Sequence, residues 1–172
     1  MKEYEVNAIY NGIDTNIIKP TKSDFRKKYN LENKKIILGV ASVWTKRKGF
    51  YDFIELSKII DENTHIVMVG VNDKQLKFLP KNVLGLKKTF TLNELAEIYT
   101  ASDVLFNSSV EETMGLTTIE ALACGTPVIV YNKTAVPEVI DENCGIVLDE
   151  NSPIVMLEAL ENMKINESSC IE

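Results

Sequence analysis

The sequence predicts an α/β fold with a single doubly wound parallel sheet and helices on both of its faces. Short β-branched runs alternate with amphipathic stretches along the whole chain. The runs are also apolar at consecutive positions, as in parallel strands that helices cover on both faces. The expected strands are Ile36–Val43, His65–Val71, Val83–Leu86, Val104–Ser108, Pro127–Tyr131 and Gly145–Leu148.

The expected helices lie between these strands, at Phe50–Asp61, Leu92–Thr100, Leu116–Cys124 and Ile154–Met163. The first of them shows apolar residues at helical spacing. Thr91, with Glu94 three residues later, has the pattern of a capping box at the start of the second. Gly125 followed closely by a proline predicts the end of the third, because glycine takes the left-handed cap and proline cannot continue a helix.

The bulk composition is that of a soluble globular protein, and 45% hydrophobic residues are enough for a sizeable core. No apolar run approaches the roughly 20 residues that span a bilayer, and no signal peptide is recognisable. We therefore expect a cytoplasmic protein without a membrane span. The formal charge of −6 and the lack of a basic stripe argue against a nucleic-acid partner. They do not exclude a small phosphorylated ligand, because a pocket needs only a few local cations.

The sequence offers neither a metal site nor a histidine-based catalytic triad. Cys124, Cys144 and Cys170 are far apart, whereas zinc needs about four ligands at short paired spacings. We expect the first two to be small core residues in a reducing cytoplasm and the third to lie in a frayed tail. The single histidine, His65, opens an expected strand, whereas catalytic groups in such sheets gather at the carboxyl ends. We expect no cofactor and no metal.

The two ends of the chain do not resemble natural domain ends. Glu5–Tyr10 has the pattern of a strand, and Asn11-Gly12 is a turn signal before a polar stretch that contains Pro20. We therefore expect residues 1–20 to be a linker and the remnant of a preceding domain. Residues 21–172 are then the parallel-sheet domain, truncated at its C-terminal helices.

The most informative segment runs from Ser108 to Ile129. It leads from the carboxyl end of one strand through a glycine-containing loop into a helix and on to the next strand. Ligand crevices in open α/β sheets lie at such carboxyl ends. The backbone N–H groups of Gly115, Leu116 and Thr117 would face outward at the start of the helix, where its dipole favours an anion such as diphosphate.

Two carboxylates, Glu112 and Glu120, flank this expected anion site. Eight helical steps would separate them by roughly 12 Å. A hydrolase that cleaves one glycosidic bond needs its carboxyl groups roughly 5 to 9.5 Å apart. A nucleotide-sugar is longer, so one carboxylate accepting from sugar hydroxyls and the other from ribose hydroxyls fits better. The alternative interpretation is that both are solvated helix-surface residues, as most glutamates are.

A second cluster, Lys46-Arg47-Lys48-Gly49, directly follows the first expected strand. It also lies at a carboxyl strand end and before a helix, so its cations reach the same crevice. A run of three charges is otherwise an ordinary solvated turn, and its position relative to the glutamate segment favours a binding role. The absence of a G-x-G-x-x-G pattern here argues against a hydride-transferring dehydrogenase.

These segments resemble the family 4 glycosyltransferases, which are retaining enzymes of the GT-B fold with two Rossmann-like domains. Glu112 to Glu120 is similar to the family's E-x7-E signature, and the Glu-Ala-Leu-Ala-x-Gly-x-Pro-Val that follows is also similar. Lys48-Gly49 resembles its Lys-Gly after the first donor-domain strand. Ile9 to Asp14 resembles the segment that joins the acceptor domain to the donor domain, and Leu95 to Ser109 follows the family pattern too. The resemblance covers nearly the whole chain.

The resemblance implies a role for each site residue. Glu112 would contact the donor sugar and Glu120 the ribose, while Lys48 would neutralise the diphosphate leaving group. The base would lie near Thr89-Phe90, and no protein nucleophile is implied. The full expected set comprises catalytic Lys48 and Glu112 and donor-binding Arg47, Thr89, Phe90, Thr113, Met114, Gly115, Leu116, Thr117 and Glu120.

The implied partners are a UDP-, GDP- or ADP-linked sugar and an acceptor sugar or lipid-linked glycan, as in bacterial polysaccharide biosynthesis. The acceptor would be held by the missing N-terminal domain, which would also make most of any peripheral contact with the inner membrane face. This chain alone is then expected to bind donor but not to catalyse transfer.

Two departures from the family pattern leave an alternative open. Ser42 stands where the family often has an arginine that joins the lysine on the diphosphate, so Arg47 replaces that charge or the second charge is absent. Glu112-Thr113-Met114-Gly115 stands where the family has Glu-Gly-Phe-Gly. The alternative is a non-catalytic nucleotide-binding module of the same fold.

Overall fold

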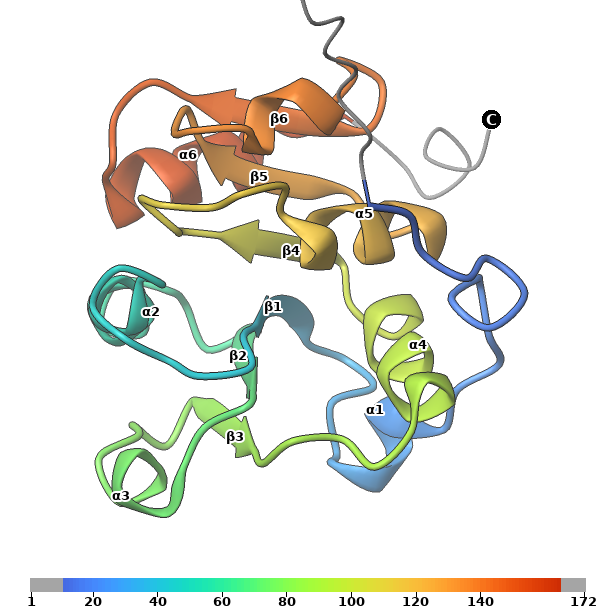
Figure 1. Ribbon diagram of the computed structural model, residues 1–172. Coiled ribbons are helices and arrows are strands. Elements are labelled where there is room, and N and C mark those ends of the chain that lie inside the picture. Colours follow the sequence, from blue (N-terminus) through green and yellow to red (C-terminus); the bar gives the residue numbers. More distant parts are fainter. Residues whose placement is uncertain (1–10, 165–172) are drawn as a thin grey trace, which may run out of the picture.

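The computed structural model describes residues 11–164, so the expected strand at Glu5–Tyr10 and the tail around Cys170 lie outside the described residues. Within that range, parallel strands form one sheet in the order β3-β2-β1-β4-β5-β6 (Figure 1). The strands are β1 (Lys35–Val40), β2 (Thr64–Val69), β3 (Val83–Leu86), β4 (Val104–Asn107), β5 (Val128–Tyr131) and β6 (Gly145–Leu148). This confirms the predicted Rossmann-like doubly wound sheet.

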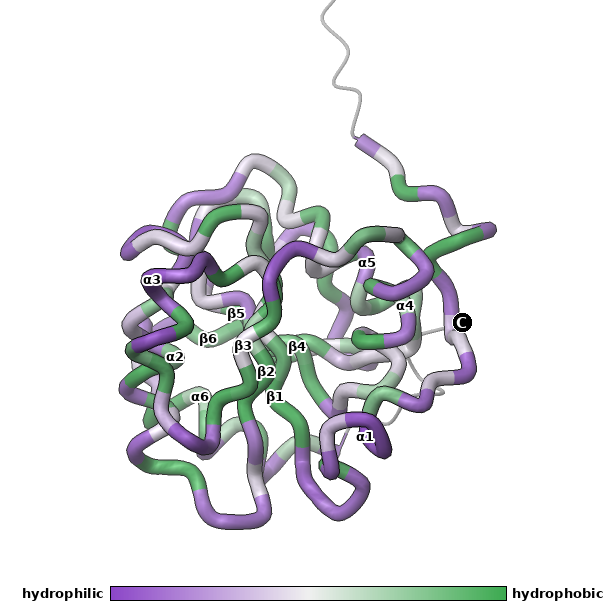
Figure 2. Tube along the Cα trace, turned by 90° about the horizontal axis from the view of Figure 1, so that it is seen from below, coloured by the Kyte–Doolittle hydropathy of each residue, from purple (hydrophilic) through white to green (hydrophobic). Residues whose placement is uncertain are grey.

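Helices cover both faces of the sheet, as predicted. They are α1 (Phe25–Lys28), α2 (Phe50–Leu56), α3 (Asp73–Leu76), α4 (Leu92–Thr100), α5 (Leu116–Ala123) and α6 (Pro153–Asn162), with a 3-10 turn η1 (Val136–Val139). Helices α1, α4 and α5 pack on one face, where Leu38 and Val67 point, and α2, α3 and α6 pack on the other, where Ile37 and Ile66 point. Figure 2 shows the hydrophobic strands at the centre and hydrophilic loops around them.

Several elements end earlier than the sequence predicted. β1 ends at Val40 because the chain turns outward beyond Ala41, leaving Val43 62% exposed. β2 and β4 also end before their predicted last residues, at Val69 and Asn107. Helix α2 stops at Leu56 because the N–H groups of Lys58 and Ile59 bond to carbonyls three rather than four residues back. The single-turn elements α1, α3 and η1 were not predicted, since one turn is too short to show a helical period.

The predicted helix ends are largely confirmed. The Thr91 hydroxyl accepts from the Glu94 N–H at 3.1 Å. The expected reciprocal bond differs, because the Glu94 carboxylate accepts from the N–H of Phe90 at 2.9 Å instead of from that of Thr91. Gly125 has φ +79°, the left-handed conformation predicted at the end of α5.

The half-buried carboxyl of Asp52, in the first turn of α2, gives a testable pH dependence of stability. Burial raises its pKa. The stability contributed by the neutral form is present below the ordinary value of about 3.9 and is lost as pH rises through the raised value. We expect Asp52→Asn to increase the free energy of unfolding at pH 7 by up to about 1 kcal/mol, because solvent screens part of the charge. Urea denaturation should show this gain vanishing near pH 3, and an equal gain at both pH values would contradict the prediction.

Candidate functional site

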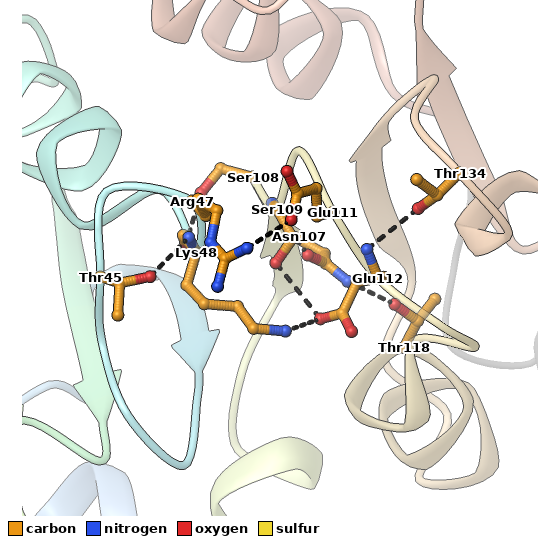
Figure 3. A network of polar contacts seen from close by, with 10 residues as sticks. All are labelled: Thr45, Arg47, Lys48, Asn107, Ser108, Ser109, Glu111, Glu112, Thr118 and Thr134. Carbon is orange, nitrogen blue, oxygen red and sulfur yellow. Dashed lines mark hydrogen bonds and ion pairs between the residues drawn. The ribbon is translucent and has the colours of Figure 1, made fainter.

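The candidate site lies where the strand order reverses, between β1 and β4. The loop 41–49 follows β1 and the loop 108–115 follows β4, and both leave the carboxyl edge of the sheet side by side (Figure 3). Neighbouring parallel strands whose connections run to opposite faces leave a crevice at this edge, where ligands of open α/β sheets bind.

The two loops are fixed against each other by their backbones. The N–H of Val110 donates to the carbonyl of Arg47 at 2.9 Å, and the Ser108 hydroxyl approaches the Lys48 carbonyl at 3.5 Å. Gly49 makes this approach possible, because its φ is +75° and a Cβ there would overlap the side chain of Ser108. A glycine is therefore required at the start of α2.

Lys48 and Glu112, 64 residues apart in sequence, form an ion pair in this crevice. The Glu112 side chain is 16% exposed and that of Lys48 33%, so the pair is largely shielded from solvent. The hydroxyl of Ser109 donates to the same carboxylate oxygen at 3.3 Å. The Thr45 hydroxyl accepts from the backbone N–H of Lys48 at 3.3 Å. The structure thus brings together the two residues expected to be catalytic.

A third segment, after β5, also reaches Glu112. The hydroxyl of Thr134 accepts from the backbone N–H of Glu112 at 3.0 Å, as Figure 3 shows. Sequence analysis did not single out Thr134, Ser109 or Thr45. Thr45 and Ser109 lie in the two segments already assigned to carboxyl strand ends, and extending the same rule to β5 would have drawn attention to the segment that contains Thr134.

The N-terminus of α5 opens into a cavity of about 200 Å³ beside the ion pair. Gly115 is its N-cap, with φ +68°, and has no side chain to accept from the first helical N–H groups. These donors and the helix dipole favour an anion. The cavity is lined by Asn11, Val40, Ala41, Ser42, Lys48, Glu112, Thr113, Met114, Gly115, Leu116 and Thr117.

A second cavity of about 460 Å³ adjoins the first and shares Ser42, Lys48, Glu112 and Thr113 with it. Its other lining residues are Val43, Thr45, Arg47, Glu111 and Thr134. The Arg47 guanidinium pairs with Glu111 at 2.6 Å, and both side chains are well exposed. Arg47 therefore lies at the rim of this cavity. Its charge was the candidate replacement for the family's arginine, whose position in this chain is occupied by Ser42.

Glu120 lies within α5, apart from the Lys48–Glu112 ion pair, and lines neither cavity. Its carboxylate accepts from the Tyr99 hydroxyl of α4 at 2.8 Å. Burial raises the pKa of Glu120 and, together with the Glu120 charge, raises that of Tyr99 well above its ordinary value, so Tyr99 remains the donor. Sequence analysis did not predict this contact.

Thr89 and Phe90 are not gathered with the other expected residues. They follow β3 at the carboxyl edge, Phe90 is 97% exposed, and neither lines the two cavities. Thr113 and Met114, which belong to the expected set, line the smaller cavity, and so does Ser42.

Cysteine and histidine lie outside this crevice, at least between residues 11 and 164. Cys124 and Cys144 are buried, and burial raises the pKa of the Cys124 thiol to about 11. His65 is at the amino end of β2, and burial with the nearby Lys34 lowers its pKa. Among the described residues, no cluster of three or more His, Cys, Asp or Glu could hold a metal ion. No helix in this range is long and apolar enough to cross a bilayer.

Comparison with known protein families identifies the family of this chain. Residues 21–170 match the family model described as "Glycosyl transferases group 1". The chain belongs to this family. Among its relatives, the O-antigen biosynthesis glycosyltransferase WclY from Escherichia coli is 27% identical over 168 residues, covering 93% of this chain and 46% of WclY. The chain thus spans less than half the length of that relative.

Solved structures show the same fold for this glycosyl transferase group 1 domain. HepE from Anabaena, crystallised with UDP and glucose, superposes with a TM-score of 0.78 at 18% identity, covering 94% of this chain and 49% of HepE. The C-terminal domain of the group 1 protein LpcC from Francisella tularensis gives 0.71 at 21% identity, covering 93% and 91% of the two chains. Both confirm the predicted Rossmann-like domain of the GT-B fold.

Proposed function

We propose that this chain binds a nucleoside-diphosphate sugar in the crevice between β1 and β4 and is the donor-binding half of a retaining glycosyltransferase. The observation that carries the proposal is the Lys48–Glu112 pair beside the open N-terminus of α5. A cation and helical N–H donors suit a diphosphate, and a neighbouring carboxylate suits sugar hydroxyls.

The two adjoining cavities supply separate places for the two parts of such a donor. The cavity of about 200 Å³ contains the α5 N-terminus and suits the diphosphate, with Gly115, Leu116 and Thr117 as donors. The cavity of about 460 Å³ has Glu112 at its boundary and suits the sugar. The larger cavity falls within the usual range of roughly 300 to 1,000 Å³ for small-molecule sites, and the smaller one, which would hold only the diphosphate, lies below it. Glu120 would reach the ribose and Thr89-Phe90 the base.

In the proposed reaction, Lys48 and the α5 N–H groups stabilise the diphosphate as the bond from the sugar's anomeric carbon to the phosphate oxygen breaks. The acceptor hydroxyl attacks the same face, and its proton passes to the departing phosphate oxygen. Glu112 orients the sugar and is not assigned as a nucleophile. The hexosyl group thus keeps its anomeric configuration.

The acceptor site belongs, in this proposal, to a preceding domain of which residues 1–20 are the linker. Relatives such as WclY are about twice as long as the matched region, which supports a second domain in the complete enzyme. HepE has been solved with UDP and glucose, and this supports a nucleotide-sugar as the donor. We expect this chain alone to bind donor without transferring sugar, because the acceptor and the facing domain complete the reacting geometry.

Calorimetric titration of the chain with UDP, GDP, ADP and their hexose conjugates tests the proposal. We expect one base to bind selectively. Glu120→Ala should weaken the free diphosphate and its conjugate alike, by about tenfold, because it removes a charged contact to the ribose. Glu112→Gln should weaken the conjugate by about tenfold and the free diphosphate much less.

The matched control is Glu161→Gln, which removes an exposed carboxylate of α6 that lines neither cavity. It should change both affinities by less than about twofold. Binding that ignores both Glu112→Gln and Glu120→Ala would contradict the assignment of the donor site.

A second candidate is a non-catalytic nucleotide-binding module, and Ser42 in place of the expected arginine favours it. Ser42 lines both cavities, so the crevice lacks the cation that the family's arginine would supply at this position. A complete protein that binds the donor but neither transfers nor hydrolyses its sugar would favour this candidate over the enzyme.

A further inference from the structure

Thr134 has a backbone conformation that β-branched residues rarely adopt. Its φ is +51°, in the left-handed region, where the side chain of an L-residue crowds the backbone. Between residues 11 and 164 the only other non-glycine with positive φ is Asn30, and asparagine tolerates this region well. Such strain persists where the surroundings dictate it, and it concentrates at functional sites.

The loop that contains Thr134 is anchored at both ends. Tyr131, the last residue of β5, and Val136, the first of η1, are each 1% exposed. Val136 also packs against the start of α5, since a Cβ at Gly115 would lie 3.3 Å from it. The four residues between these anchors therefore have little freedom, and Thr134 takes the strained conformation in this turn.

The strained conformation directs the Thr134 hydroxyl at the backbone of Glu112. That hydroxyl accepts the Glu112 N–H at 3.0 Å, while Lys48 and Ser109 hold the carboxylate of the same residue (Figure 3). Glu112 is thus fixed at its backbone by the segment after β5 and at its carboxylate by the loops after β1 and β4. Thr134 lines the larger cavity, on the sugar side, and does not line the smaller one at the α5 N-terminus.

We infer that Thr134 is a positioning residue whose hydroxyl fixes the Glu112 backbone so that the carboxylate meets the sugar of the donor. The inference rests on the proposed function, because it assigns Glu112 to the sugar. It goes further in predicting that loss of the hydroxyl weakens recognition of the hexosyl group and leaves recognition of the diphosphate intact. The strain at Thr134 is then the cost of placing Glu112.

Three substitutions separate the hydroxyl from the strain. Thr134→Ser keeps the hydroxyl and should bind the nucleoside-diphosphate hexose within about twofold of the unchanged chain. Thr134→Ala removes the hydroxyl and should weaken that ligand about three- to tenfold, with less than a twofold effect on the free diphosphate. Thr134→Gly should show the same selective loss and, because glycine adopts positive φ without strain and alanine does not, should melt about 2 °C above Thr134→Ala.

A second readout needs no ligand. Hydrogen exchange of the Glu112 backbone amide should be similar in the unchanged chain and in Thr134→Ser, and roughly tenfold faster in Thr134→Ala and Thr134→Gly. Exchange at Val110, whose N–H bonds to the carbonyl of Arg47, serves as the control and should not change. A purely structural role would alter both amides together.

The outcomes distinguish this inference from the proposed function. If the unchanged chain binds no nucleoside diphosphate or conjugate, the proposed function fails, and the sugar-presenting role of Thr134 fails with it. If donor binds but Thr134→Ala weakens the free diphosphate and the conjugate equally, the proposed function stands and the inference is overturned. Loss in Thr134→Ser as large as in Thr134→Ala, or unchanged exchange at Glu112, also overturns it.

Discussion

Replacing Lys48 by methionine should weaken binding of the nucleoside diphosphate and of its hexose conjugate by about 100-fold. Methionine keeps most of the length of the side chain but removes the cation that lies beside the α5 N-terminus. Lys48 also neutralises Glu112, whose side chain is only 16% exposed. In the variant, this carboxylate faces the incoming diphosphate without its partner, so a lost charged contact and a new repulsion act together. A change of about 2.7 kcal/mol in binding free energy is typical of such a loss.

The same loop offers a matched control in Lys46→Met. Lys46 is two residues away, carries the same charge, and lines a separate groove between α2 and α3. Calorimetry should find donor affinity within about twofold of the unchanged chain, since exposed charges at a distance contribute little. Equal losses in Lys46→Met and Lys48→Met would mean that net charge, and not the crevice, governs binding.

Replacing Gly49 by alanine should destabilise the domain by about 3 to 4 kcal/mol. Left-handed geometry costs an alanine roughly 1 to 2 kcal/mol, and the φ of Gly49 is +75°. The new Cβ would also overlap the Ser108 hydroxyl and lie 2.9 Å from the Ser108 carbonyl oxygen. Because Ser108 is 1% exposed, it has no space into which to move. Urea denaturation measures the loss, and donor binding should fall with it because the two loops separate.

Gly12→Ala is the control for this prediction. A Cβ at Gly12 would meet no atom within 4 Å, and the residue does not have the left-handed φ of Gly49. Its unfolding free energy should stay within about 0.5 kcal/mol of the unchanged chain. A Gly49→Ala variant as stable as this control would show that the two loops are not in rigid contact.

The proximity of Lys48 and Glu112 could be predicted from the sequence because it follows from the topology of the sheet. Two segments that each follow a strand of a parallel sheet must emerge at the same edge, whatever their separation along the chain. The reversal of strand order between β1 and β4 then places them next to each other. Apolar runs and glycine or proline signals located the strands well enough for this argument, although their ends were wrong by a few residues.

The parts that sequence did not reveal depend on packing between elements. The hydrogen bond from Tyr99 to Glu120 exists because α4 and α5 pack on the same face of the sheet, and no local pattern encodes it. Thr134 escaped notice because nothing in a sequence marks a threonine for positive φ. The positions of Thr89 and Phe90 as base contacts came from resemblance alone and remain a prediction.

The close contact between the loops 41–49 and 108–115 separates the crevice into a backbone framework that cannot change easily and side chains that can. Gly49 and Ser108 are in close contact and tolerate little change, and the backbone N–H of Val110 bonds to the Arg47 carbonyl, so the backbones of the two loops are held together. Ser42 and Thr113, by contrast, are exposed on the walls of both cavities. Under the proposed function, exchanging the side chains at these two positions is expected to alter which sugar is accepted without destabilising the backbone that carries Lys48 and Glu112.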